Sequence, residues 1–258
     1  MTRRDQILAE LGLTPLWLDR SRLDTVAPSV AESRQPGTNR SAEPEPAGQQ
    51  SRGAQTDATR NGRPVQEMDW PQLRQAVAQC TACVLHERRK QAVLGVGDEH
   101  ADWLIVGEGP GAEEDARGEP FVGQAGKLLD NMLAAIGLAR GKNVYIANVV
   151  KCRPPGNRTP TLDEAEACAA YLDRQIDLIE PRLIVALGKV AAHRLLGRDA
   201  TLGSLRKTVH QYRGIPLVVT YHPAYLLRNL TDKAKAWEDL RFAVDTMSGL
   251  PDEKGARQ

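Results

Sequence analysis

The sequence of 258 residues has few aromatic side chains and almost no excess of charge of either sign. Phe, Trp and Tyr make up 4% of it, and 34 Lys and Arg face 33 Asp and Glu, for a net charge of +1. A net charge so close to zero creates no long-range field that would draw the whole protein onto DNA or an anionic membrane. Any binding of nucleic acid must therefore use a local basic patch.

The sequence also lacks a long apolar run. A membrane-spanning helix needs about 18 or more consecutive apolar residues, and no stretch comes near that length. The first residues lead into Arg3, Arg4 and Asp5, which is not the pattern of a secretory signal peptide. We therefore expect a cytoplasmic protein that does not associate with a membrane. We also expect it to act as a monomer.

Only four cysteines are present: Cys80, Cys83, Cys152 and Cys168. In a compartment that keeps thiols reduced, two structural disulfides are not expected in a chain of this size. Four thiolates are the number that closes a zinc site or an iron–sulfur cluster, and the spacing does not separate these two. The alternative is four free thiols that pack as small apolar side chains.

Composition divides the chain into four parts. Residues 24–67 are rich in Pro, Gly, Ser and Gln and have no Leu, Ile, Met or aromatic residue, which predicts a disordered linker. Residues 1–23 predict a short helix and an apolar tail. This segment either packs on the main domain or is an interaction peptide, with a protein partner for residues 1–20. Residues 68–250 predict the folded domain, and 251–258 a disordered tail.

Apolar runs alternate with helical patterns through the folded part. Nearly continuous apolar runs are typical of parallel strands that are covered on both faces. The expected strands are 101–107, 143–150, 182–187 and a pair at 208–212 and 216–221; the expected helices are 70–79, 124–138, 161–180, 188–196 and 232–247. The predicted fold is α/β: a single three-layer domain with a small, mostly parallel central sheet flanked by helices, plus the disordered N-terminal extension.

Three of the expected strands end in polar loops. The first ends at Gly107 in a glycine-rich stretch, the second at Asn148, and another just before His222. Ligands of open α/β sheets bind outside the carboxyl ends of the strands, so we expect these loops to form one site. Taken singly, Asn148 is more typical of a turn cap, and His222 of a histidine whose hydrogen bonds are satisfied by the backbone.

Four separated motifs carry a family resemblance. They are GEGPGAEEDARGEPFVGQAG, NVVKCRPPGNRTP, ALGKVAA and YHPAYLLR, and the CxxC pair precedes them. Over about residues 70–247 the chain resembles the family 4 uracil-DNA glycosylases, the iron–sulfur branch of the uracil-DNA glycosylase superfamily. The resemblance implies a [4Fe–4S] cluster on the four cysteines. It also implies hydrolysis of the N-glycosidic bond of deoxyuridine, in single- or double-stranded DNA, as the first step of base excision repair.

The resemblance also implies roles for residues of the pocket. A base must leave the helical stack to be reached, and Phe121 would stack on the flipped uracil. Asn148 would accept from uracil N3–H and donate to O4, while the backbone at Glu108 and Gly109 lines the pocket. His222 would donate to O2 as negative charge develops there.

The resemblance also bears on the residue that activates water. Gly109 stands where better-known relatives carry an aspartate. Glu114 is the candidate for polarising water or stabilising a sugar cation, and the alternative is a carboxylate that favours a helix N-terminus. Asn157 matches another family position near the site. The KRRIH motif of the branch that binds uracil-DNA irreversibly is absent between residues 118 and 126, which favours turnover over covalent trapping.

A set of basic residues is predicted to lie at the loops of one face and to neutralise DNA phosphates. The set is Lys127, Lys151, Arg153, Arg158, Arg206, Lys207, Arg213 and Arg228. Leu227 is the candidate wedge for the vacated stack. Two other functions stay open: a non-catalytic iron–sulfur module that binds uracil-DNA, and a nucleotide-binding redox protein. The second lacks both the GxGxxG pattern and a Walker lysine motif.

Overall fold

The computed structural model describes residues 59–60 and 63–251, all within the second of two compact units, residues 53–258. The predicted segment 1–23, most of the predicted linker and all but the first residue of the predicted tail lie outside the described residues. Those predictions therefore stay as they were made.

The folded part begins before residue 68. Strands β1 (Thr59–Arg60) and β2 (Arg63–Pro64) pair antiparallel, and the 3₁₀ helix η2 (Val65–Glu67) follows. Val65 is 1% exposed and belongs to the main core cluster. The last residues of the predicted linker, Val65–Glu67, are therefore helical in the structure, and Val65 packs in the core.

A six-stranded sheet forms the centre of the domain, in the order β3-β5-β4-β6-β8-β7. Strands β5, β4, β6 and β8 run parallel, and the two edge strands run antiparallel to their neighbours. The bounds are β3 Val96–Gly97, β4 Trp103–Gly107, β5 Val144–Asn148, β6 Leu183–Leu187, β7 His210–Tyr212 and β8 Ile215–Thr220. The predicted α/β fold with a mostly parallel sheet is confirmed.

Helices cover both faces of this sheet. The main helices are α2 Trp70–Ala78, α3 Ala112–Arg117, α4 Gln124–Ala134, α5 Leu162–Ile179, α6 Gly188–Leu196, α7 Leu202–Leu205, α8 Pro223–Leu226 and α9 Lys233–Ser248. Successive side chains of β4 point to opposite faces. Leu104 and Val106 pack in the core cluster of α5 and α6, whereas Trp103 and Ile105 pack in that of α4 and α9.

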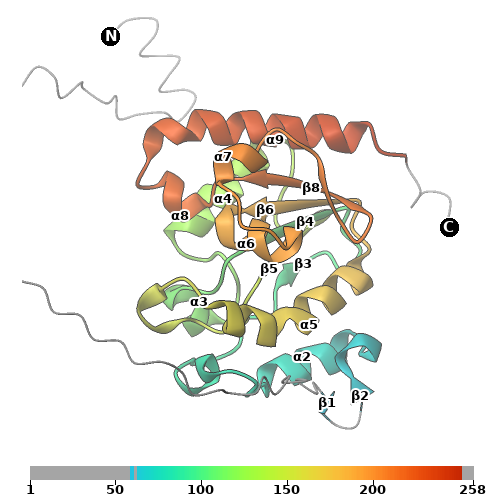
Figure 1. The fold of residues 1–258 in the computed structure, drawn as a ribbon, viewed down its shortest axis with the longest axis vertical. Coiled ribbons are helices and arrows are strands. Elements are labelled where there is room, and N and C mark those ends of the chain that lie inside the picture. Colours follow the sequence, from blue (N-terminus) through green and yellow to red (C-terminus); the bar gives the residue numbers. More distant parts are fainter. Residues whose placement is uncertain (1–58, 61–62, 252–258) are drawn as a thin grey trace, which may run out of the picture. The chain divides into compact units, whose positions relative to one another are not determined.

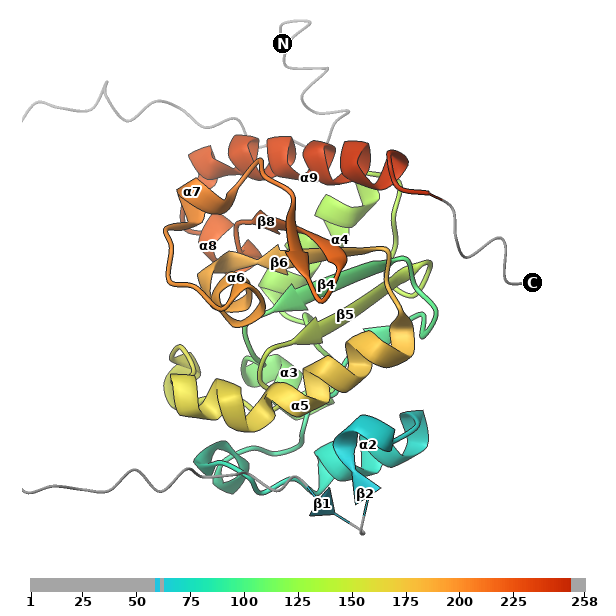
Figure 2. The same ribbon diagram turned by 45° about the vertical axis from the view of Figure 1, so that its right-hand side comes forward.

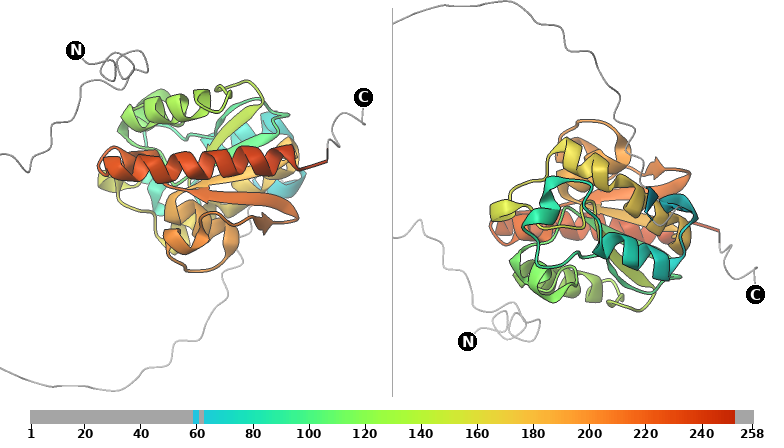
Figure 3. Two further views of the ribbon diagram at one scale, coloured as in Figure 1. Left: turned by 90° about the horizontal axis from the view of Figure 1, so that it is seen from above. Right: turned by 90° about the horizontal axis from the view of Figure 1, so that it is seen from below.

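The pictures show the same three layers. In Figures 1 and 2, α9 (red) and α5 (yellow) lie on opposite sides of the sheet, and α2 lies beside α5. Seen from above in Figure 3, α4 (green) and the α6–α7 segment (orange) lie on opposite sides of α9. None of the helices in residues 59–60 and 63–251 has the length and apolarity that a membrane crossing requires.

Local sequence signals account for several element ends. The Thr161 hydroxyl accepts from Glu164 N, and the Glu164 carboxylate accepts from Thr161 N, which confirms the predicted capping box of α5. Arg213 and Gly214 both have positive φ, as a tight hairpin turn between β7 and β8 requires. The acidic stretch after Gly111 forms helix α3, which was not predicted as a helix.

The parallel strands bring the three polar loops to one edge of the sheet. Gly107 and Asn148 are register partners at the ends of β4 and β5. Strand β8 ends at Thr220, two residues before His222. The carboxyl ends of the parallel strands, where a ligand was expected, therefore bring Gly107, Asn148 and His222 to one side of the sheet.

Candidate active site

A cavity of about 870 Å³ opens at this edge of the sheet. Its lining includes Glu108, Gly109, Glu114, Phe121, Asn148, Asn157, Arg158, His222 and Arg228. Of the remaining site predictions, Lys127, Arg153 and Leu227 are not part of the lining. Lys127 and Leu227 are exposed, so they lie where a long ligand outside the cavity could reach them.

Phe121, Asn148 and His222 meet at the end of strand β4. The Phe121 and His222 ring centroids are 5.5 Å apart, with 33° between the ring planes. A Cβ atom at position 107 would lie 2.5 Å from both Phe121 Cζ and Asn148 Oδ1. Glycine at the strand end therefore allows the aromatic ring and the amide to approach each other.

The Phe121 backbone has φ of +55°, which is unusual for a bulky residue and costs about 1–3 kcal/mol. Two nearby residues of the same chain allow Phe121 to keep this backbone conformation. A Cβ at position 126 would collide with the Phe121 carbonyl oxygen, so only glycine fits there. Glu114 Oε1 accepts from Val122 N and Gly123 N at 2.9 and 3.0 Å.

Glu114 thus ties the glycine-rich stretch together. Its second oxygen, Oε2, accepts from Gly111 N at 3.1 Å, so both oxygens are engaged with backbone donors. The alternative role, that of a carboxylate at a helix start, is present in the structure because Gly111 precedes α3. The carboxylate also lines the cavity, so its contacts leave a catalytic role open.

Asn148 is 2% exposed, and its Oδ1 has no hydrogen-bond partner among the described residues. Leaving a buried acceptor unpaired costs about 1–3 kcal/mol, and native proteins contain few such atoms. The backbone behind it is fixed, because Lys151 Nζ donates to Asn148 O at 2.8 Å. Asn148 therefore presents a free acceptor beside Phe121 and His222.

His222 is the N-cap of α8, and its Nδ1 accepts from Ala224 N at 3.2 Å. Burial, together with the nearby Arg228, lowers the pKa of His222 to about 4, and Glu114 opposes the shift. The ring is therefore neutral at pH 7. Because Nδ1 accepts a hydrogen bond, the proton is on Nε2, which is left as the donor of the ring.

Polar residues of two loops form the rim of the cavity. Burial raises the pKa of Glu108, against the effect of its hydrogen bond with Thr159. Asn157 is exposed, and its Oδ1 accepts from Arg153 Nε at 2.7 Å. Arg158 is paired through both terminal nitrogens with Glu164, at 2.8 and 2.6 Å. A phosphate at Arg158 would therefore compete with this carboxylate.

Two of the basic residues do not lie where they were predicted. Lys151 is 1% exposed and its ammonium donates to Asn148 O and Gln175 Oε1, so it cannot reach a phosphate. Burial lowers its pKa to about 8. Arg213 lies in the β7–β8 turn, at the amino-terminal end of β8 and therefore at the opposite ends of the strands from the cavity. It pairs there with Asp177.

Several lining residues were not predicted. Tyr221 and Tyr225 line the cavity and stack with ring centroids 5.3 Å apart. Their position on either side of His222-Pro223, a pair already expected at the site, is a signal that could have identified them. Lys189, at the first turn of α6, also lines the cavity.

The four cysteines line a second, much smaller cavity of about 10 Å³. All four are free thiols. Hydrogen bonds reach these sulfurs: Arg89 Nη1 donates to Cys152 at 2.9 Å, Lys151 N to Cys168 at 3.3 Å, and Ala82 N to Cys80 at 3.5 Å, and the Leu85 backbone bonds to Cys83. No three His, Cys, Asp or Glu side chains in the described part of the chain are grouped as ligands of one metal ion.

Burial dominates the acid–base chemistry of Cys83, Cys152 and Cys168. It raises the pKa of Cys83 and Cys152, and that of Cys168 to about 12. Arg89 opposes the shift at Cys152. Thiols of this kind are protonated at pH 7, so any metal that they bind must displace their protons.

The family model of the uracil-DNA glycosylase superfamily matches residues 94–241. The type-4 uracil-DNA glycosylase of Pyrobaculum aerophilum is 45% identical over 181 residues, which are 67% of this chain and 92% of that protein. The type-4 enzyme of Thermotoga maritima is 45% identical over 161 residues, 62% of this chain and 83% of that protein. The type-5 enzyme of Thermus thermophilus is 37% identical over 153 residues, 50% and 68% respectively. The chain therefore belongs to the uracil-DNA glycosylase superfamily, in its family 4.

Proposed function

We propose that this protein is a uracil-DNA glycosylase, which takes uracil out of the DNA stack and hydrolyses its N-glycosidic bond. The products are free uracil and an abasic site, the starting point of base excision repair. Flipping the base costs a few kcal/mol, which contacts in the pocket must offset. The observation that carries the proposal is the buried Oδ1 of Asn148, which has no hydrogen-bond partner among the described residues and belongs to the cavity that Phe121 and His222 also line.

The Asn148 amide has the hydrogen-bonding pattern that uracil requires. Its Oδ1 would accept from uracil N3–H, and its NH₂ would donate to O4. Cytosine carries an acceptor at N3 and a donor at its 4-amino group, so both contacts would be lost. Such a site discriminates strongly, because the wrong base leaves its buried polar groups unpaired.

Phe121 and His222 act on the same base from two directions. The Phe121 ring would stack on the uracil plane, which is worth about 1–3 kcal/mol per base in single-strand binding. When the bond between C1′ and N1 breaks, its electron pair stays on uracil and raises the negative charge at O2. His222 Nε2–H, neutral and desolvated, would donate to O2; one such donor contributes about 10²–10³ in rate.

Water then adds to the sugar carbon C1′, leaves a hydroxyl group there and releases one proton, which balances the proton that the uracil anion takes up to become free uracil. Glu114 lines the cavity, and its negative charge would stabilise the positive charge that develops on the sugar. Its three backbone contacts fix the position of that charge. Glu108 and Gly109 contribute backbone to the same wall, and Asn157 part of the rim.

We further propose a [4Fe–4S] cluster on Cys80, Cys83, Cys152 and Cys168. An all-cysteine donor set with hydrogen bonds to the sulfurs suits such a cluster. A cluster offers each thiolate its own iron atom, so the sulfurs need not converge on one ion as zinc requires. It would tie the loop after α2 to the start of α5 and supply structure. Because it needs reduced thiols, we infer a cytoplasmic location.

The DNA-binding surface is proposed around the cavity rim. Lys127, Arg153 and Arg228 would contact phosphates, and Arg158 would do so after leaving Glu164. Leu227, 41% exposed at the end of α8, would enter the vacated stack. We further propose that a monomer is the active form.

An assay of uracil release on single-stranded oligonucleotides tests this function. We expect free uracil and an alkali-labile abasic site, in repeated turnovers. Binding of the oligonucleotide without abasic product would favour the non-catalytic module instead. Affinity for a nucleotide cofactor without either result would favour the redox protein.

A further inference from the structure

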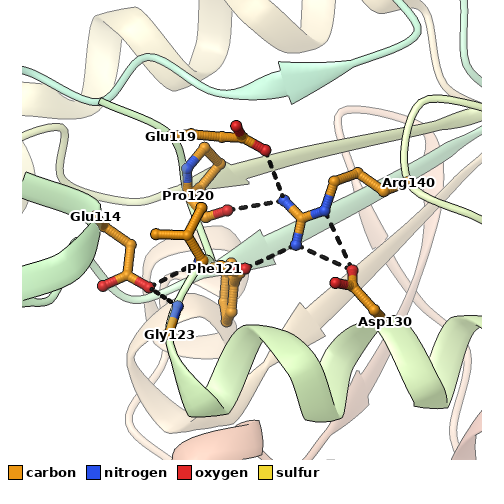
Figure 4. Close-up of polar contacts among 8 residues, drawn as sticks. Glu114, Glu119, Pro120, Phe121, Gly123, Asp130 and Arg140 are labelled. Carbon is orange, nitrogen blue, oxygen red and sulfur yellow. Dashed lines mark hydrogen bonds and ion pairs between the residues drawn. The ribbon is translucent and has the colours of Figure 1, made fainter. Parts of the chain in front are cut away.

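Arg140 contacts the segment that carries the uracil platform, although 19 residues separate it from Phe121. It lies in a tight turn between α4 and β5, where Lys142 N donates to Ala139 O at 3.0 Å. Its Nη1 donates to Pro120 O and its Nη2 to Phe121 O, both at 2.8 Å. Figure 4 shows Arg140 and Glu114 approaching this segment from opposite sides.

The Arg140 guanidinium is itself held in place. Asp130 on α4 accepts from Nε at 3.2 Å and from Nη2 at 3.0 Å, and Glu119 lies 3.5 Å from Nη1. The side chain is only 20% exposed. One planar fork therefore binds a helix carboxylate on one side and two carbonyl oxygens on the other. A lysine ammonium, with a single nitrogen, cannot reproduce this geometry.

These contacts complete a clamp on a strained residue. Phe121 adopts positive φ, and such a conformation persists only where its surroundings over-determine it. Glu114 binds the two N–H groups that follow Phe121, and Arg140 binds the carbonyl of Phe121 and the one before it. Without the arginine, the segment loses both bonds on one side of the strained peptide.

We propose that Arg140 is a positioning residue for the glycosylase, which keeps the Phe121 ring in the orientation that receives the flipped uracil. The inference rests on the proposed function and adds a residue that does not line the cavity. If the platform is correctly placed in only a fraction of molecules, the apparent affinity for substrate falls by that fraction. Loss of Arg140 should therefore raise KM more than it lowers kcat.

The test is a double-mutant cycle with Phe121, measured as uracil release from a single-stranded oligonucleotide. Arg140→Ala should raise KM about ten-fold and change kcat less than about three-fold. In a Phe121→Ala background, Arg140→Ala should change kcat/KM less than about two-fold, since coupled residues are not additive. Arg140→Lys should behave like Arg140→Ala, because it keeps the charge and loses the fork.

Arg194→Ala is the matched control. Arg194 is 16% exposed and binds both oxygens of Asp173, away from the cavity. Its removal should lower the thermal midpoint to a similar degree and leave KM unchanged. The proposal is overturned if Arg194→Ala raises KM equally, or if the Arg140 and Phe121 effects are additive. If Arg140→Ala does not fold, Arg140→Lys with wild-type KM overturns it. A wild-type protein that releases no uracil would instead refute the proposed function.

Discussion

The cavity at the sheet edge and the cavity of the four cysteines differ in how their polar groups are satisfied. In the first, Asn148 Oδ1 is buried without a hydrogen-bond partner in the described part of the chain, and the Phe121 backbone is strained. In the second, sulfur atoms receive hydrogen bonds from Arg89, Lys151 N and Ala82 N, and the space is small. The first arrangement suits a ligand that binds and leaves. The second suits a group that stays.

Lys151 joins the two regions. Its backbone N donates to Cys168 Sγ, and its ammonium donates to the carbonyl of Asn148. The loop that supplies Cys152 therefore begins immediately after the strand that ends at Asn148. Lys151 thus links the cysteine region to the cavity, and we expect each region to fail in its own way when it is altered.

The largest effect is expected from His222→Ala, which should alter the cavity region and leave the cysteine region unchanged. Removal of the donor to O2 should lower the rate of uracil release by about 10²–10³. Absorbance of the cluster and the thermal midpoint should stay close to wild type, because His222 does not contact the cysteines. Single-turnover kinetics on single-stranded DNA measure the rate, and near-wild-type release would refute its role.

Cys168→Ser should instead alter the cysteine region. The purified wild-type protein should be brown, with broad absorbance near ~400 nm from thiolate-bound iron. The variant should lose that absorbance and unfold at lower temperature, since cluster binding is linked to folding. Absorbance spectra, iron analysis and thermal melts measure these effects. A colourless wild-type protein that contains zinc would contradict the cluster.

The acid side of the pH profile tests the state of His222. With a pKa of about 4, the ring is neutral at pH 5.5, so uracil release should change less than about two-fold between pH 7 and 5.5. A histidine with the ordinary pKa of about 6.5 would be about nine-tenths protonated at pH 5.5. Loss of activity centred near pH 6.5 would contradict the burial of the ring.

The same group makes stability depend on pH. Between pH 6.5 and about 4, His222 of the unfolded chain binds a proton that the folded chain does not bind. Its contribution to stability is therefore present above pH 6.5 and is lost as the pH falls through that window. His222→Ala should show a smaller loss of stability over this range than wild type does, and equal losses would contradict the lowered pKa.

The smallest effect is expected from deletion of residues 1–58. The lining of the main cavity runs from residue 108 to 228, so kcat should stay within about two-fold of wild type. A deletion that extends through Val65 removes a residue that is 1% exposed in the core, and it should lower the thermal midpoint. A large loss of kcat in the shorter deletion would show that residues 1–58 take part in catalysis.

The sequence allowed the sheet edge to be predicted, because apolar runs with polar ends are local patterns. Parallel strands then place Gly107, Asn148 and His222 together without further information. Burial of Lys151 could not be predicted in this way, since a charged residue type normally predicts exposure. Nor could the contact of Arg140 with Phe121, because it depends on how α4 and its following turn pack against the loop.

The most direct test of the account compares two single-stranded oligonucleotides that differ only in uracil or cytosine at one position. Wild-type protein should release uracil and no cytosine, and Asn148→Ala should lose about 10²-fold or more of the uracil activity while it keeps the absorbance near ~400 nm. Equal release of both bases, or wild-type activity in Asn148→Ala, would contradict the role of the buried Oδ1 in reading the base.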